Sequence, residues 1–66
     1  MPTENLNTSE KIRLELDRQN ISATDFSAAL GITQTATNRR LRLNAWNLKM
    51  LEKAATVLNV TVQDLI

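Results

Sequence analysis

The sequence predicts an all-α protein, a compact four- to five-helix bundle, and three observations support this fold class. Apolar residues recur at three- and four-residue spacing, most clearly at Leu48, Leu51, Ala55 and Leu58. Residues that cap helices precede each such run, and the chain has one glycine and one proline. With 66 residues and no cysteine or histidine, packed helices are the main source of stability open to it.

The first helix is predicted to begin after Asn7 and to run to about Gln19. Asn7 is placed to cap it, with Glu10 at the capping-box position three residues later. Asn20 is expected to end the helix in the left-handed conformation. The inner face is expected to carry Ile12 and Leu16, with Leu14 on one flank.

The middle of the chain predicts two short helices joined by a tight turn. Ser22 is placed to cap the first, with Asp25 bonding back to it, and Thr33 to cap the second. Gly31, the single glycine, is expected to adopt positive φ and end the first helix abruptly. This arrangement is typical of a helix-turn-helix, whose second helix (about residues 33–42, the recognition helix) is presented to a surface. The first helix of this helix-turn-helix and the turn after it are expected to supply four core residues, namely Phe26, Ala29, Leu30 and Ile32.

The recognition helix carries polar side chains without carboxylates on its outward face. At about 100° per residue, that face gathers Gln34, Thr35, Asn38, Arg39 and Arg42. Glutamine and asparagine pair with adenine in the major groove, and arginine pairs with guanine. The face therefore predicts binding to double-stranded DNA, with Gln34 and Thr35 at the base edges and Arg39 as the strongest base contact.

The charge distribution supports the same interpretation. The net charge is only +1, but residues 39–53 hold five basic side chains and one acidic side chain. Such clustering is typical of nucleic-acid binding. The alternative is a chance basic patch on a solvated face. On the first interpretation Arg40, Arg42 and Lys49, with the N-terminus of the fourth helix, hold phosphates.

The last third of the chain predicts a fourth helix and a final turn. Asn47 is placed to cap the helix and Asn59 to close it, with Met50 and Ala54 widening its apolar stripe. Val60 is expected to return the chain to the core, and Thr61 with Asp64 to start the final turn. Two points stay open. Trp46 either covers the edge of the core or donates its indole N–H to DNA. The apolar residues at the C-terminus either form a dimer contact or cap the core of the monomer, and these residues are Val62, Leu65 and Ile66.

The motif ISATDFSAALGITQTATNRRLR, followed by LKMLEKAATVLNVTVQDLI, resembles the lambda-repressor-like (Cro/CI, XRE) helix-turn-helix family over roughly residues 10–66. The resemblance implies a five-helix bundle that binds operator DNA, usually as a dimer, and represses or activates transcription. Matching the motif by position, the resemblance implies that four residues contact bases, namely Gln34, Thr35, Asn38 and Arg39. It also places four residues near positions that contact phosphate, namely Ser22, Arg42, Asn44 and Asn47.

The chain departs from that family pattern at four places. Ala23 stands where the family commonly has a glutamine that braces a phosphate and the recognition helix. Ser27 replaces the usual alanine where the two helices are expected to approach closely, and Thr37 replaces the usual valine or isoleucine as a weaker anchor of the recognition helix. Leu43 and Asn44 replace the glycine that often follows the recognition helix. These departures concern stability and the path of the third loop more than the fold.

Together these features predict a sequence-specific transcriptional regulator, a small phage or mobile-element repressor of the Cro/CI kind. We expect it to bind a palindromic operator as a homodimer in the bacterial cytoplasm. The alternative is a protein-interaction module of the same fold, resembling an anti-repressor or an antitoxin. Residues 1–8 are predicted to be a flexible N-terminal tail and residues 9–66 the DNA-binding domain.

The sequence gives no support to an enzyme, a cofactor or a membrane protein. It has no histidine or cysteine and no phosphate-cradling glycine loop, so it lacks a nucleophile–base pair and a metal cluster. No apolar run reaches the roughly 18 residues of a membrane span. We therefore expect no small-molecule substrate, no metal and no membrane partner.

Overall fold

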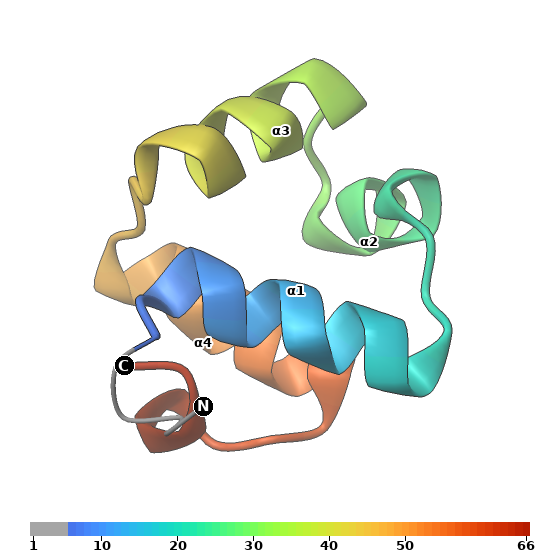
Figure 1. The fold of residues 1–66 in the computed structure, drawn as a ribbon. Helices are drawn as coiled ribbons and strands as arrows, with labels where there is room; N and C mark the ends of the chain where they lie inside the picture. The colour runs from blue at the N-terminus through green and yellow to red at the C-terminus, as the bar shows by residue number, and fades with distance from the viewer. Residues whose placement is uncertain (1–5) are drawn as a thin grey trace.

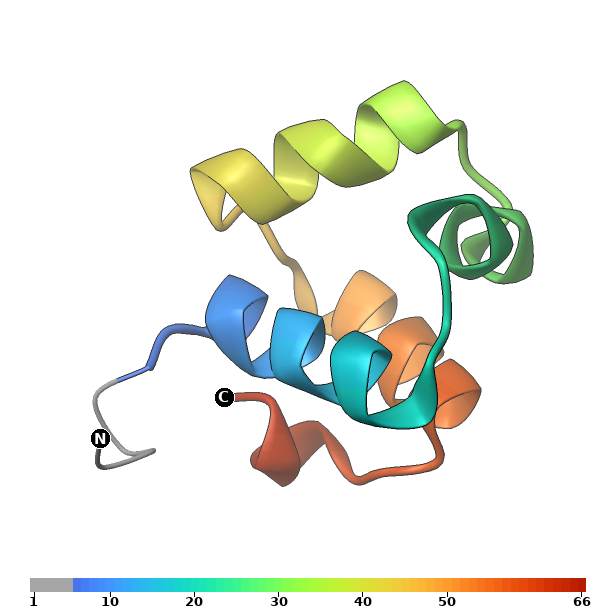
Figure 2. The same cartoon turned by 45° about the vertical axis from the view of Figure 1, so that its right-hand side comes forward.

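A computed structural model of the protein describes residues 6–66, which form four α-helices and a final 3₁₀ turn. In chain order the elements are α1 (Thr8–Gln19), α2 (Ala23–Leu30), α3 (Gln34–Leu43), α4 (Leu48–Leu58) and η2 (Val62–Asp64). Helices α1 and α4 lie side by side, and α2 and α3 pack above them, with α3 at the outer edge (Figures 1 and 2). The predicted all-α bundle is confirmed. None of the described helices is long and apolar enough to cross a membrane.

Polar side chains cap the start of each helix at the predicted residues. The Asn7 side chain accepts from the backbone N–H of Glu10, and the Glu10 carboxylate accepts from the Asn7 N–H at 3.1 Å. Ser22 and Thr33 accept in the same way from N–H groups of α2 and α3. At Ser22 the predicted box is only half formed, because Asp25 does not bond back in the described structure.

The final turn has a complete capping box between Thr61 and Asp64. The Asp64 carboxylate accepts from the backbone N–H of Thr61 at 3.0 Å, and this bond lowers the pKa of Asp64 from its ordinary value. At the other end of the chain, α1 begins at Thr8 and is capped by Asn7, so the predicted tail of residues 1–8 overlaps the first helix. The rest of that prediction concerns residues 1–5, which lie outside the described residues.

Each α-helix ends on a residue in the left-handed conformation. Gly31 ends α2 with φ 76°, as predicted, and asparagines end the other three: Asn20 (φ 57°), Asn44 (φ 53°) and Asn59 (φ 57°). Asparagine tolerates this conformation better than other side chains that carry a Cβ. Asn44 therefore performs the backbone role of the glycine that often follows a recognition helix, which explains how this departure keeps the fold.

The core draws on all four helices and on the final turn. Most predicted core positions are buried, including Ile12, Leu16, Phe26, Leu30, Leu51, Ala55 and Leu58. Met50 and Ala54 are buried, as predicted for the wider stripe of α4. Ile32 and Val60 are half-buried and pack against this core.

Three residues predicted to be internal are exposed instead. Leu48 is 64% exposed, because it is the first residue of α4 and precedes the turns that pack against the other helices. Leu14 is 52% exposed, since two residues after Ile12 a helix has turned about 200° away from the buried stripe. Ala29 lies beside Leu30 but on the solvent side of α2.

The C-terminal apolar residues divide between the two interpretations left open. Leu65 is fully buried, and half-buried Val62 packs against the same core. Ile66 is 61% exposed. Leu65 and Val62 therefore complete the core of this chain, and of the three only Ile66 presents most of its side chain to the surface.

The crossing of α2 and α3 contains a buried pair of hydroxyl groups. The Ser27 and Thr37 oxygens lie 2.7 Å apart and are hydrogen-bonded, and both residues are at most 3% exposed. Each hydroxyl also lies within hydrogen-bond distance of a carbonyl of its own helix, Ser27 of Ala23 at 2.7 Å and Thr37 of Thr33 at 3.2 Å, so the two hydroxyl protons are shared among these three contacts. The two departures from the family pattern are thus matched to each other, because the hydroxyl that replaces a methyl in one helix bonds the hydroxyl in the next.

This pairing predicts non-additive effects of removing the two hydroxyl groups. We expect Ser27→Ala and Thr37→Val each to lower the free energy of unfolding by about 0.5–1.5 kcal/mol, the usual net value of one hydrogen bond. The double variant should lose less than the sum, with a coupling of about 0.5–1 kcal/mol. Urea unfolding of the four proteins measures the cycle. Additive losses would show that the two hydroxyl groups stabilise the protein independently.

Candidate nucleic-acid interface

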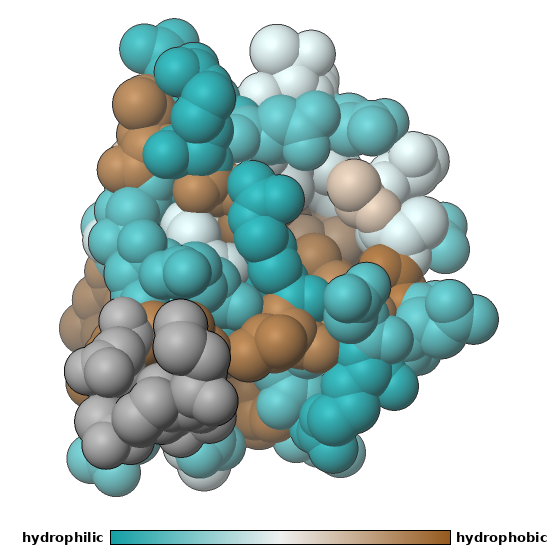
Figure 3. Space-filling view, viewed as in Figure 1, coloured by the Kyte–Doolittle hydropathy of each residue, from teal (hydrophilic) through white to brown (hydrophobic). Residues whose placement is uncertain are grey.

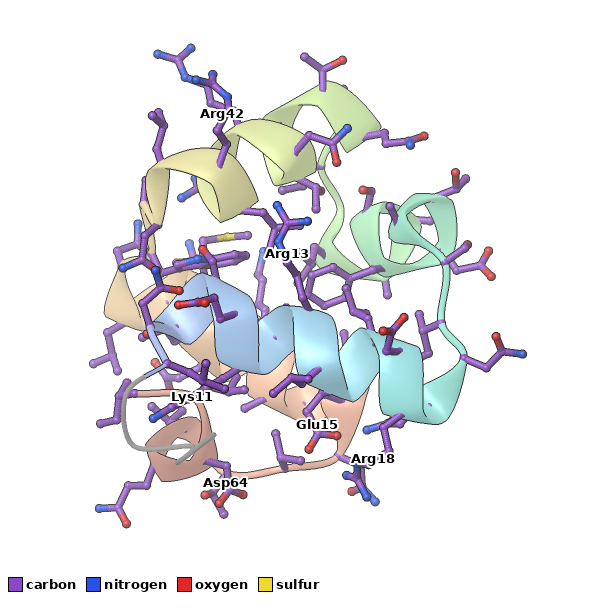
Figure 4. The ribbon with its side chains drawn as sticks, in the orientation of Figure 1. Lys11, Arg13, Glu15, Arg18, Arg42 and Asp64 are labelled. Atoms are coloured by element: carbon purple, nitrogen blue, oxygen red, sulfur yellow. The ribbon has the colours of Figure 1, made fainter. Side chains whose placement is uncertain are left out.

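The outward face of α3 forms an open concavity with part of α1. Six residues line it: Arg13, Thr35, Asn38, Arg39, Arg42 and Leu43. The surface over α3 is mainly hydrophilic, and Figure 4 shows Arg42 projecting from it (Figures 3 and 4). Four of the five side chains predicted to share one face therefore do border one hollow, and no carboxylate is among the lining residues.

Gln34, the fifth predicted face residue, is exposed but lies outside this lining. Its side-chain oxygen accepts a hydrogen bond from the Thr24 hydroxyl of α2 at 3.0 Å. Because that bond uses the oxygen, it orients the amide N–H₂ group away from Thr24. Ala23 lacks the bracing side chain common in the family, and Thr24, the next residue, provides a bond between the two helices.

The end of α3 is tied to the start of α1 through Asn44. The Asn44 side-chain oxygen accepts from the Ser9 backbone N–H at 3.0 Å and from the Ser9 hydroxyl at 3.1 Å. The first bond satisfies one of the N–H groups that the start of a helix leaves without an intrahelical partner. The predicted phosphate contact at Asn44 would use its amide N–H₂ group, which these two bonds do not involve.

Trp46 joins the same cluster. Its indole Nε1–H donates to the Ser9 hydroxyl at 3.0 Å, and its half-buried ring packs against the core. The predicted cover over the core edge is what the structure shows. An indole contact to DNA would require this bond to Ser9 to break, because a protein oxygen already takes that donor.

The other predicted phosphate contacts lie at three separate places. Ser22 is exposed at the start of α2, while Asn47 and Lys49 are exposed at the start of α4. Asn47 caps α4 by accepting from the Met50 N–H at 2.8 Å. Arg40, near the end of α3, is half-buried and donates one Nη1–H to the Ala45 carbonyl at 3.0 Å. Its remaining N–H donors are those a phosphate would use.

The arginines of this region form no ion pair within the described residues. Within residues 6–66 the one ion pair joins Arg18 to Glu15, and this contact lowers the pKa of Glu15 from its ordinary value. Both residues project from α1 on the side away from α3 (Figure 4). The arginines around the concavity are thus positive charges without a carboxylate within ion-pair distance in the described chain. The same residues contain no group of acidic side chains that could hold a metal ion.

Helix α2 ends at a glycine, a short turn leads to α3, and the two capped helices cross at small residues. Together with the exposed polar face of α3, these features define a helix-turn-helix DNA-binding protein. A family model described as the Cro/C1-type HTH DNA-binding domain matches residues 11–66, and the chain belongs to that family. The match spans the helix-turn-helix and the whole of α4. No curated protein and no solved structure matches the chain.

Two residues of this region were not predicted from the sequence. Thr24 was missed because its bond to Gln34 depends on the angle between α2 and α3. Arg13 was missed because local periodicity places it beside Ile12, on the flank of a buried stripe, without saying which helix lies next to that flank. The four-residue spacing places Ser9 and Arg13 on one face of α1, but only the bond between Ser9 and Asn44, which was not predicted, shows that this face lies next to α3.

The cluster around Ser9 predicts a structural role for the Asn44 side chain. Asn44→Gly keeps the left-handed backbone accessible but removes both bonds to Ser9, so we expect a loss of about 1–3 kcal/mol in unfolding free energy. The matched control is Asn59→Gly, at a left-handed helix end whose side chain makes no described hydrogen bond. It should change stability by about 0.5 kcal/mol or less. Urea unfolding compares the two, and equal losses would contradict the structural role.

Proposed function

We propose that the protein is a sequence-specific transcriptional regulator that inserts α3 into the major groove of operator DNA. The observation that carries the proposal is the acid-free face of α3, where amide, hydroxyl and guanidinium groups surround one concavity. These groups match the donor and acceptor pattern of base edges, which the major groove displays uniquely for each base pair. Membership of a DNA-binding family supports the choice of partner.

In this proposal the N-terminal part of α3 reads the sequence. Gln34, braced by Thr24, and Thr35 stand at the start of the helix, where recognition helices contact base edges. Asn38 and Arg39 follow one turn later and line the same face. Arg39 supplies the strongest contact, bidentate to a guanine and worth about 1–3 kcal/mol of discrimination.

Phosphate contacts then set the orientation of α3. Arg42 lies on its outward face, and Arg40 lies near its end. The helix dipole and the N–H groups that Asn47 does not cap attract an anion to the start of α4, and the first turn of α4 carries no acidic residue that would oppose this. The full proposed set of phosphate contacts is Ser22, Arg40, Arg42, Asn44, Asn47 and Lys49.

We further propose that two copies bind a palindromic operator. A single α3 offers few base contacts, and a second copy on a two-fold site doubles them. The chain would then act as a homodimer on DNA, as a repressor of the Cro/CI kind in a phage or mobile element of a bacterial cell. This finer assignment rests on the resemblance to that family.

The DNA-binding proposal predicts that Arg39 controls sequence preference. Selection from randomised duplex DNA should enrich one palindromic site. Arg39→Ala should reduce the preference for that site over random duplex by about 5- to 150-fold, which corresponds to 1–3 kcal/mol. Arg39→Lys keeps the charge but loses the bidentate fork, so it should lose preference while retaining the salt dependence of wild type.

Binding assays at two salt concentrations distinguish the proposal from the alternative module. Phosphate contacts make affinity fall steeply with salt, whereas an apolar protein interface does not depend on salt in this way. If no site is enriched and Arg39→Ala leaves binding unchanged, the DNA proposal fails. A protein partner would then be the function to pursue.

The two-copy proposal predicts cooperative binding with a fixed spacing. Half-sites about one helical turn apart place both copies on the same side of the duplex. Inserting about five base pairs between them turns one half-site to the opposite side, and we expect affinity to fall about tenfold or more. Titration followed by native mass spectrometry gives the affinity and the number of chains bound per duplex. One chain bound per duplex, with no effect of spacing, would contradict the dimer.

A further inference from the structure

Arg13 borders the recognition face although it belongs to α1. It lines the concavity together with four polar residues of α3, namely Thr35, Asn38, Arg39 and Arg42. Its side chain projects from α1 toward α3, whereas Arg18 of the same helix projects to the opposite side (Figure 4). Two helices therefore contribute guanidinium groups to one surface hollow.

The position of Arg13 is fixed by the contact between α1 and the end of α3. Ser9 bonds Asn44, the residue that ends α3, through both its backbone N–H and its hydroxyl. Arg13 follows Ser9 by four residues, so it lies one turn further along the same face of α1. The face that touches the end of α3 thus carries Arg13 beside the body of α3.

The charges around the concavity indicate an anionic partner. Its lining contains three arginines and no carboxylate, and no ion pair involves Arg13 within residues 6–66. Glu10 and Asp17 lie beside Arg13 along α1 and border a second surface hollow that Arg13 also lines. Neither carboxylate forms an ion pair with Arg13 in the described chain, and Glu10 already accepts from the Asn7 N–H. Like charges gathered without acids repel one another, and a bound anion relieves that repulsion.

We propose that Arg13 is a DNA-contacting residue that binds a backbone phosphate beside the groove occupied by α3, an inference that rests on the proposed function. The walls of the major groove are phosphate backbones, and α1 lies beside α3 along one of those walls. The planar guanidinium fork matches the geometry of phosphate oxygens. The contact sets the orientation of α3 without reading a base.

The test compares Arg13→Gln with Arg18→Gln on random duplex DNA and on the selected site. Both changes remove one positive charge from an exposed position of α1, so the two variants have the same net charge. Affinities are measured between about 50 and 200 mM salt. For Arg13→Gln, the slope of log affinity against log salt should fall by about 0.9, so that the affinity lost over this range shrinks about 3.5-fold. Arg18→Gln should retain the slope of wild type.

The outcomes separate this inference from the function on which it rests. Equal weakening of random and selected duplexes by Arg13→Gln, with the reduced slope, supports a phosphate contact. If Arg13→Gln matches Arg18→Gln while Arg39→Ala still loses site preference, Arg13 is outside the interface and the function stands. If Arg13→Gln changes which sequence is preferred, Arg13 reads a base and the phosphate assignment is wrong. Failure of the wild-type protein to bind either duplex overturns both proposals.

The same experiment includes Arg13→Lys, which separates the effect of losing the charge at this position from the effect of an altered fold. Lysine keeps the charge on a flexible stem, so the variant should retain the salt slope and lose only part of the affinity. Thermal unfolding of wild type and of each variant measures whether the fold is kept. A full loss of slope in Arg13→Lys, with its fold intact, would contradict an electrostatic contact.

Discussion

The close crossing of α2 and α3 is the constraint on which the recognition surface depends. Only two residues of α3 are buried, Thr37 and Leu41, so this helix has little apolar surface with which to hold its position. At the crossing the Ser27 and Thr37 hydroxyl groups bond each other at 2.7 Å, which allows small polar residues where an apolar pair would otherwise pack. Each hydroxyl also lies within hydrogen-bond distance of a carbonyl of its own helix, so the contact between the two hydroxyl groups adds a polar link across the crossing.

Further polar contacts hold α3 at both of its ends. Thr24 bonds Gln34 at the start of the helix, and Ser9 bonds Asn44 just after its end. These contacts use side chains in the first turns of α1, α2 and α3, together with the residue that ends α3. On the outward face of α3 they engage only Gln34 and leave the four residues that line the concavity without a hydrogen bond from their side chains to the rest of the described chain. Hydrogen bonds are directional, so they fix the angle of a helix more closely than a few apolar contacts do. A helix that reads base edges needs its angle fixed, because its side chains must reach defined atoms in the groove.

Sequence patterns predicted the elements of this fold better than the contacts between them. The caps at Asn7, Ser22, Thr33 and Asn47 were correct, because a cap depends on residues within one turn. Leu48 and Leu14 were misplaced, because periodicity gives the direction of an apolar stripe but not where its partner helices begin. The polar face of α3 followed from its own period, whereas Arg13 joins that face through a contact between residues 35 positions apart in sequence. Such long-range pairs leave no periodic trace.

A net charge of +1 is compatible with DNA binding when the charges are placed as they are here. Total charge governs long-range attraction, which any duplex exerts equally, whereas phosphate contacts depend on where each cation lies. The acidic residues Glu10, Glu15 and Asp17 lie on α1 outside the lining of the concavity, so they lower the total without occupying the recognition face. A protein built in this way gains less from non-specific attraction. Under the proposed function, a larger share of its affinity would come from base contacts of α3, which favours discrimination between sequences over simple adhesion to DNA.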